Sequence, residues 1–125
     1  MILQERIIYL YKGDSMANPI KLIVFPVKDV AKAKAFYATY LETDPYVDSE
    51  YYIGYKAGDL EIGLDPHGQD VVSYIEVDDI EASVKELEAA GATVHMEPKN
   101  VGGGLMVAQV KDTEGNVVGM RQFPK

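Results

Sequence analysis

Two apolar runs along the chain are each followed by a helical pattern. The runs cover residues 20–27 and 71–77, and residues 27–31 match residues 77–81 at an offset of 50. A repeat of this period decides the architecture, because each copy is one supersecondary unit that must bury its apolar face against its neighbour. The pattern therefore predicts two copies of one unit.

Each helical pattern begins at an aspartate. Asp29 and Asp79 are suited to the N-cap position, where a carboxylate accepts from free backbone N–H groups. Gly91 is placed to end the second helix. Helical spacing gives the first helix the apolar stripe Val30, Ala33, Tyr37, Tyr40 and Leu41, and the second the stripe Ile80, Val84 and Leu87.

Strand-like stretches follow both helices. They cover residues 51–56 and 60–64 in the first half, with Ala57-Gly58-Asp59 as the turn, and residues 93–96, 105–111 and 117–122 in the second half. An early strand near Tyr46 is weaker. The fold class is therefore α+β, with two tandem βαβββ units over residues 20–65 and 71–123. Joined edge to edge, they predict a curved mixed sheet with helices outside and a concave cleft.

The first residues differ from the rest. Residues 1–15 are interpreted as an N-terminal extension and residues 16–125 as a single domain. Met16 is a natural start, so Met1 and Met16 stay alternative initiators. The other interpretation is an added strand or arm, because residues 6–11 are β-forming.

Charge and composition narrow the function classes. The net charge of -8 argues against nucleic acid and anionic membranes as partners, because proteins that bind them carry basic faces. The chain has no cysteine, which excludes disulfides and thiolate chemistry. The first residues make a poor signal peptide and no apolar run is long enough to span a bilayer, so we expect a cytoplasmic protein.

Three local patterns in order carry a family resemblance: Val27-x-Asp29-Val30-x-x-Ala33-x-x-Phe36-Tyr37, then Val77-x-Asp79-Ile80-x-x-Ser83-x-x-x-Leu87-x-x-x-Gly91, then Gly102-Gly103-Gly104 with Asp112-x-x-Gly115-Asn116-x-x-Gly119. Together they resemble the glyoxalase/bleomycin resistance/dioxygenase superfamily, also called vicinal oxygen chelate proteins. The resemblance covers residues 20–123 and implies the glyoxalase-like fold.

The resemblance also implies four positions for divalent-metal ligands, on the first and last strands of each unit. They map to Leu22, Gly63, Val72 and Gly119, and none of these side chains can ligate a metal. We therefore expect no cofactor, with a divalent metal as the alternative.

Strand alternation then sorts the faces. If those four positions face the cleft, so do Glu61, Tyr74, Glu76 and Arg121. Arg121 either orients a ligand carboxylate or pairs with a glutamate, and Glu61 and Glu76 are weak candidates for a base. The two glycines leave room either for a ligand or for a bulky neighbour.

Aromatic and imidazole groups complete the candidates. Tyr51 and Tyr55 share one strand face, and we expect them to line the cleft as an aromatic wall, with packing in the core or at a sheet edge as the alternative for each. His67 is expected in solvent and His95 partly exposed, with a cleft role as the alternative for both.

Four functions remain open. The first is a protein that binds a small organic molecule in a metal-free cleft. The others are a metal-dependent glyoxalase-type lyase, isomerase or dioxygenase, a metal-independent enzyme with a glutamate base, and a regulatory module. Exposed sheet edges, together with the resemblance, predict a homodimer.

Overall fold

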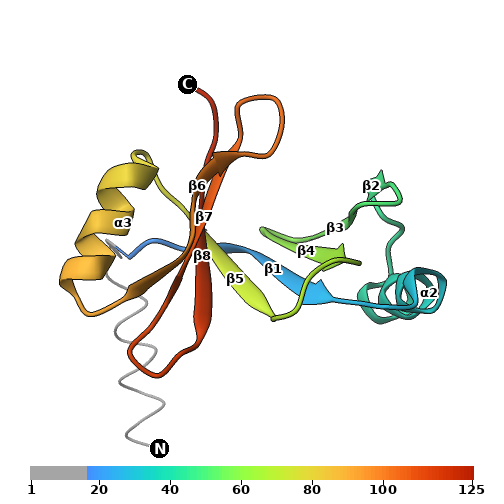
Figure 1. The fold of residues 1–125 in the computed structure, drawn as a ribbon. Helices are drawn as coiled ribbons and strands as arrows, with labels where there is room; N and C mark the ends of the chain where they lie inside the picture. Colours follow the sequence, from blue (N-terminus) through green and yellow to red (C-terminus); the bar gives the residue numbers. More distant parts are fainter. Residues whose placement is uncertain (1–16) are drawn as a thin grey trace, which may run out of the picture.

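The computed structural model describes residues 17–125, so the predicted extension at residues 1–15 and the candidate initiator Met16 lie outside the described residues. The first unit contains β1 (Ile20–Pro26), α2 (Val30–Leu41), β2 (Val47–Asp48), β3 (Ile53–Ala57) and β4 (Leu60–Asp65). The second contains β5 (Val72–Glu76), α3 (Ile80–Ala89), β6 (Thr93–Asn100), β7 (Met106–Lys111) and β8 (Val117–Gln122). Figure 1 shows the two units following one another along the molecule.

Within these residues, eight strands form one curved sheet in the order β2-β3-β4-β1-β5-β8-β7-β6. Strand β1 pairs with β4 in parallel, and β5 pairs with β8 in the same way. The antiparallel pair of β1 and β5 joins the two units within one chain. The predicted fold class of two βαβββ units is thus confirmed.

The repeat fixes the centre of this sheet. Ile23 pairs with Ser73 across β1 and β5, and these two residues are separated by the same offset of 50 that the sequence repeat shows. A pseudo-twofold axis therefore passes through this pair. It relates the parallel pair of β1 and β4 to that of β5 and β8.

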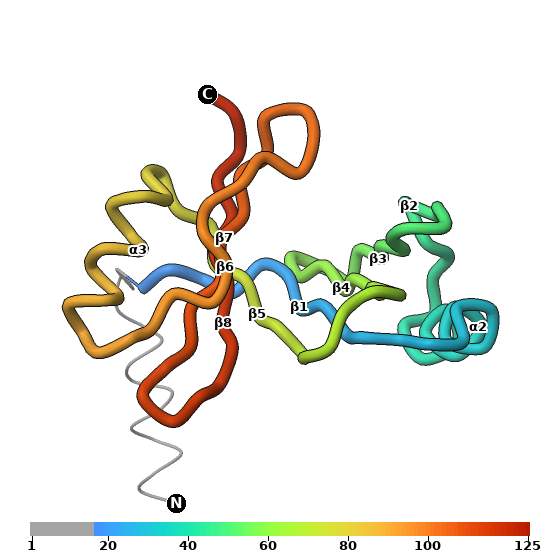
Figure 2. The backbone as a smooth tube through the Cα atoms, in the orientation of Figure 1, coloured from blue at the N-terminus to red at the C-terminus, as the bar shows by residue number. Residues whose placement is uncertain are grey.

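The helices cover one face of the sheet, α2 over the first unit and α3 over the second, and lie far apart (Figures 1 and 2). Asp29 accepts from the backbone N–H of Lys32 at 3.0 Å and Asp79 from that of Ala82 at 3.1 Å, as the caps predict. Helix α3 packs on Ala108, Val110 and Met120. Neither helix in this part of the chain is long and apolar enough to cross a membrane.

The structure contradicts the predictions for three tyrosines. Tyr55 lies under α2 with 0% exposure, and its hydroxyl donates to the carbonyl of Lys34 at 2.9 Å. The reason is register, because Gly54 pairs with Gly63 and so turns Tyr55 toward the helix. Tyr40, which helical spacing places on the apolar stripe of the first helix, is 71% exposed and does not join the core.

Tyr51 does not form the expected wall with Tyr55 either. It precedes β3, in the turn that follows β2, and is 69% exposed. Its neighbour Tyr52 instead packs against Gly54 and Gly63 on the side of the sheet opposite to the helices.

Candidate functional site

The face of the sheet opposite to the helices, called the inner face below, has an apolar cluster of its own. Leu22, Val72 and Tyr74 are buried there, and Val24, Val107 and Val117 pack against them. Ile23 of β1, which lies between Leu22 and Val24, packs on the α2 side instead, as does Ile62 of the neighbouring strand β4. The sorting of faces from strand alternation therefore agrees with the structure for these strands.

Tyrosine rings occupy the space that the two inner-face glycines leave. Gly119 lies opposite Tyr74 in the β5–β8 pair, and a Cβ at Gly119 would overlap that ring, with Cζ at 3.0 Å. At Gly63 a Cβ would overlap the hydroxyl end of Tyr52, with Cζ at 2.6 Å. Of the two interpretations of these glycines, room for a bulky neighbour is the one that the structure supports.

A three-residue ion-pair network, called the arginine cluster below, brings together three predicted site residues from β4, β5 and β8. Nη2 of Arg121 donates to Oε2 of Glu61 at 2.7 Å and to Oε1 of Glu76 at 2.8 Å. The side chain of Arg121 is only 9% exposed. Arg121 is thus the ion-pair partner of two glutamates. Because two carboxylates already surround the one guanidinium, the cluster does not attract a ligand carboxylate.

Hydrogen bonds around Glu61 decide its charge. Tyr46 donates to Oε1 of Glu61, the carboxylate oxygen that Arg121 leaves free. Burial raises the pKa of Glu61, but the hydrogen bonds from Tyr46 and Arg121 outweigh it and hold the pKa below its ordinary value. A general base works best with a pKa near the working pH. Glu61 is therefore poorly suited to that role.

The inner face also holds a cavity of about 230 Å³, called the inner cavity below. Its residues come from β1, the end of β4, the β4–β5 connection, β5, β6 and β7: Val24, Asp65, His67, Gly68, Gln69, Asp70, Val72, Tyr74, His95 and Gln109. Nε2 of Gln109 donates to the hydroxyl oxygen of Tyr74 at 2.7 Å. Apolar and hydrogen-bonding groups thus meet in one recess, as in small-molecule sites.

Both histidines of the chain line the inner cavity, although each is exposed as predicted. The backbone N–H of His67 donates to Oδ1 of Asp65 at 2.8 Å, which fixes the turn that carries it. His95 lies at a register shift between Val94 and Met96 in β6. The sequence did not predict that the two histidines lie around one cavity, and it did not single out Gln109. Gln109 pairs with Gly119 in the hairpin of β7 and β8, and this pairing with a candidate cleft position is the signal that could have identified it.

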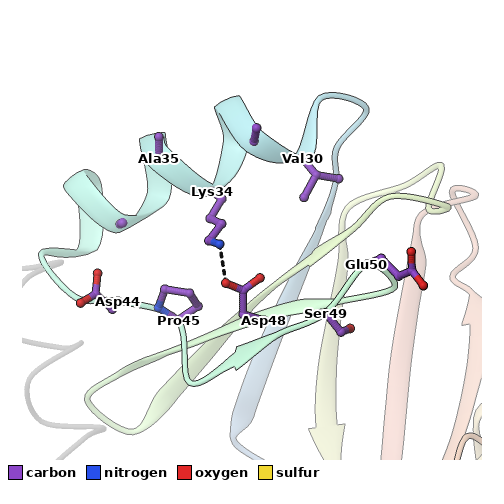
Figure 3. A pocket seen from close by; sticks show the side chains of 10 residues that line it. Val30, Lys34, Ala35, Asp44, Pro45, Asp48, Ser49 and Glu50 are labelled. Carbon is purple, nitrogen blue, oxygen red and sulfur yellow. Dashed lines mark ion pairs between the residues drawn. The ribbon is translucent and has the colours of Figure 1, made fainter.

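A larger hollow of about 730 Å³ lies away from the inner face, between α2 and β2. Figure 3 shows Lys34 of the helix facing Asp48 of the strand across it, where the two form an ion pair. The lining is Val30, Ala31, Lys34, Ala35, Ala38, Asp44, Pro45, Asp48, Ser49 and Glu50. Its one lysine is already paired with Asp48, and the other charged groups of the lining, Asp44 and Glu50, are carboxylates.

The four positions implied for metal ligands do not fit a metal. Leu22 and Val72 are buried aliphatic side chains, and Gly63 and Gly119 lie under tyrosine rings. From residue 17 onward, no group of three or more imidazole, thiolate or carboxylate side chains is arranged to hold a metal ion. Neither the donor chemistry nor the space at these points suits a divalent ion.

Comparisons with solved structures show the same fold at low identity. The manganese-bound glyoxalase of Novosphingobium aromaticivorans is 22% identical with a TM-score of 0.66, over 84% of this chain and 38% of that one. Methylmalonyl-CoA epimerase of Streptomyces coelicolor is 15% identical with a TM-score of 0.65, over 89% and 100%. A superfamily member from Vibrio splendidus 12B01 is 17% identical with a TM-score of 0.62, over 85% and 99%.

Among curated protein sequences, none matches this chain significantly. The sequence profile of the glyoxalase/bleomycin resistance protein/dioxygenase superfamily matches residues 20–120, which is most of the chain. The chain therefore belongs to the glyoxalase/bleomycin resistance protein/dioxygenase superfamily.

Proposed function

We propose that this protein binds a small organic molecule in the inner cavity, without a divalent ion at the family's ligand positions. The observation that carries the proposal is the cavity itself, where Tyr74 and Gln109 form a hydrogen-bonded pair above aliphatic residues of β1 and β5. Its volume corresponds to roughly seven or eight water molecules. A ligand with one aromatic ring is therefore the appropriate size.

Binding of a one-ring probe is the first test. Benzamide should shift the amide NMR signals of Val72, Tyr74 and Gln109, which line the cavity. Tyr74→Phe should weaken its affinity by roughly fivefold, because one hydrogen bond is worth about 1 kcal/mol. Tyr40→Phe is the matched control, since Tyr40 is exposed on α2. Signal shifts centred on Lys34 and Asp48, with no effect of Tyr74→Phe, would place binding in the other hollow.

Metal content is the second test. Untagged protein, purified without chelator and measured by elemental mass spectrometry, should carry far less than one divalent ion per chain, because Leu22, Gly63, Val72 and Gly119 offer no donor side chain. One tightly held ion per chain that survives gel filtration would instead favour the metal-dependent alternative.

The metal-independent alternative receives less support. Glu61 and Glu76 both accept from Arg121, so a glutamate acting as base would have to break an ion pair before taking a proton. The homodimer and the cytoplasmic location stay predictions.

A further inference from the structure

We infer that the inner cavity selects organic cations over anions of the same size and shape. The inference rests on the proposed binding function and adds the charge of the ligand to it. Two features support the charge selection: the charged groups that line the cavity and the commitment of the buried arginine nearby. The hydrogen-bonding state of Tyr74 adds a contact that does not depend on the charge of the ligand.

The charged groups that line the cavity are acidic. Asp65 and Asp70 contribute carboxylates, and no lysine or arginine is among the lining residues that the structure describes. Asp65 is partly buried and Asp70 is exposed, so each should attract a cation about as strongly as a surface charge pair does. The carboxylates favour a ligand that carries positive charge. The imidazole rings of His67 and His95, which are uncharged when deprotonated, offer flat surfaces and so favour a planar ligand.

The buried cation on the same face does not cancel this acidity. Arg121 donates to both Glu61 and Glu76, so the arginine cluster has one more negative than positive group. An anionic ligand entering the inner face would therefore find no free guanidinium in the cluster, and it would meet carboxylates in the cavity lining.

Tyr74 supplies a second recognition element. It is 8% exposed, lines the cavity and accepts from Gln109, while its own hydroxyl proton has no acceptor among residues 17–125. Burial, the largest effect, raises the pKa of Tyr74, so the hydroxyl stays protonated as a donor. The ligand is therefore a small planar cation that also presents an acceptor or a π-face to this hydroxyl.

The test compares benzamidine, benzamide and benzoate, which share one ring and differ in charge. Titrations followed by amide NMR at pH 8, where free imidazole is neutral, should give the tightest binding for benzamidine and the weakest for benzoate. Asp70→Asn should weaken benzamidine binding by roughly twofold to fivefold, as expected for one exposed charge pair, and leave benzamide unchanged. Asp59→Asn is the control, because it removes the same charge in the turn at the other end of β4.

The outcomes separate the two proposals. If benzamide or benzoate binds at Tyr74 and Gln109 as tightly as benzamidine does, the charge selection is wrong while the binding function stands. Equal effects of Asp70→Asn and Asp59→Asn would also overturn the charge selection, because they would reflect net charge alone. If none of the three probes shifts the cavity signals, the proposed function fails and the charge selection fails with it.

Discussion

Arg121→Met is expected to lower the free energy of unfolding by about 2–3 kcal/mol at neutral pH. Removing the cation of a fully buried ion pair costs more, but the side chains of Glu61 and Glu76 are 20% and 39% exposed, so water can solvate part of the charge that is left. Glu61 and Glu76 would then face each other across the space that the guanidinium now fills. Urea unfolding followed by circular dichroism measures the loss. A loss below about 1 kcal/mol would show that the cluster is solvated and contributes as little as a surface pair.

Replacing all three residues of the arginine cluster should lower the free energy of unfolding by less than replacing Arg121 alone. In the triple variant Arg121→Met, Glu61→Gln, Glu76→Gln no charge remains uncompensated, so most of the lost stability should return. Arg121 already lacks a partner for Nε among residues 17–125, so an apolar replacement sacrifices few hydrogen bonds. A triple variant as unstable as Arg121→Met would mean that packing, and not charge, carries the effect.

The loss of stability in Arg121→Met should also depend on pH. Burial raises the pKa of Glu61, and the hydrogen bonds from Tyr46 and Arg121 lower it further than burial raises it, so the folded pKa lies below the ordinary value. Such a carboxylate stabilises the fold above its unfolded pKa, and this contribution is lost as pH falls through the folded pKa. The difference between wild type and Arg121→Met should therefore be full at pH 7 and shrink below about pH 4.

Much of this fold could be predicted because the sequence repeats. The offset of 50 placed both N-caps and both first strands, and the structure pairs the equivalent residues Ile23 and Ser73 at the centre of the sheet. Strand alternation then placed Glu61, Glu76 and Arg121 on one face, where they meet. These inferences needed only periodicity and capping chemistry, which act locally.

The tyrosine wall could not be placed by alternation alone. Alternation separates Tyr52 from Tyr55 but does not say which of them faces inward. With Ala57-Gly58-Asp59 as a three-residue turn, odd-numbered residues of β3 would face inward with Gly63. The hairpin instead has Gly58 and Asp59 as its two turn residues, pairs Ala57 with Leu60 and so pairs Gly54 with Gly63. The error comes from a turn that is one residue shorter than predicted, because a shift of one residue in the pairing moves every side chain of the strand to the opposite face of the sheet.

The inner cavity was hidden from sequence reasoning for a different reason. It joins His67, in a connection without regular structure, to His95, at an irregularity in β6. Neither position follows from a periodic pattern. The ring of Tyr74 over Gly119 was equally hidden, since a glycine in a strand shows that something lies close but not what it is.

Gly119→Ala is expected to destabilise the protein by about 2–3 kcal/mol, and Gly63→Ala by less than about 1 kcal/mol, although the two glycines hold corresponding positions in the repeat. At Gly119 the added methyl would overlap the body of the Tyr74 ring, which is buried and held by Gln109. At Gly63 it would meet the hydroxyl end of Tyr52, which forms no hydrogen bond within the described chain and is less buried than Tyr74. Chemical denaturation of the two variants measures this difference.

A second substitution separates a ring clash from a backbone effect. In a Tyr74→Ala background, Gly119→Ala should be neutral or stabilising by about 0.5–1 kcal/mol, because the clash is gone and alanine suits a strand better than glycine. That change of sign is an interaction energy between the two positions, which residues in contact can show. If Gly119→Ala costs the same in both backgrounds, the strand itself requires glycine, and the Tyr74 ring is not the reason that Gly119 has no side chain.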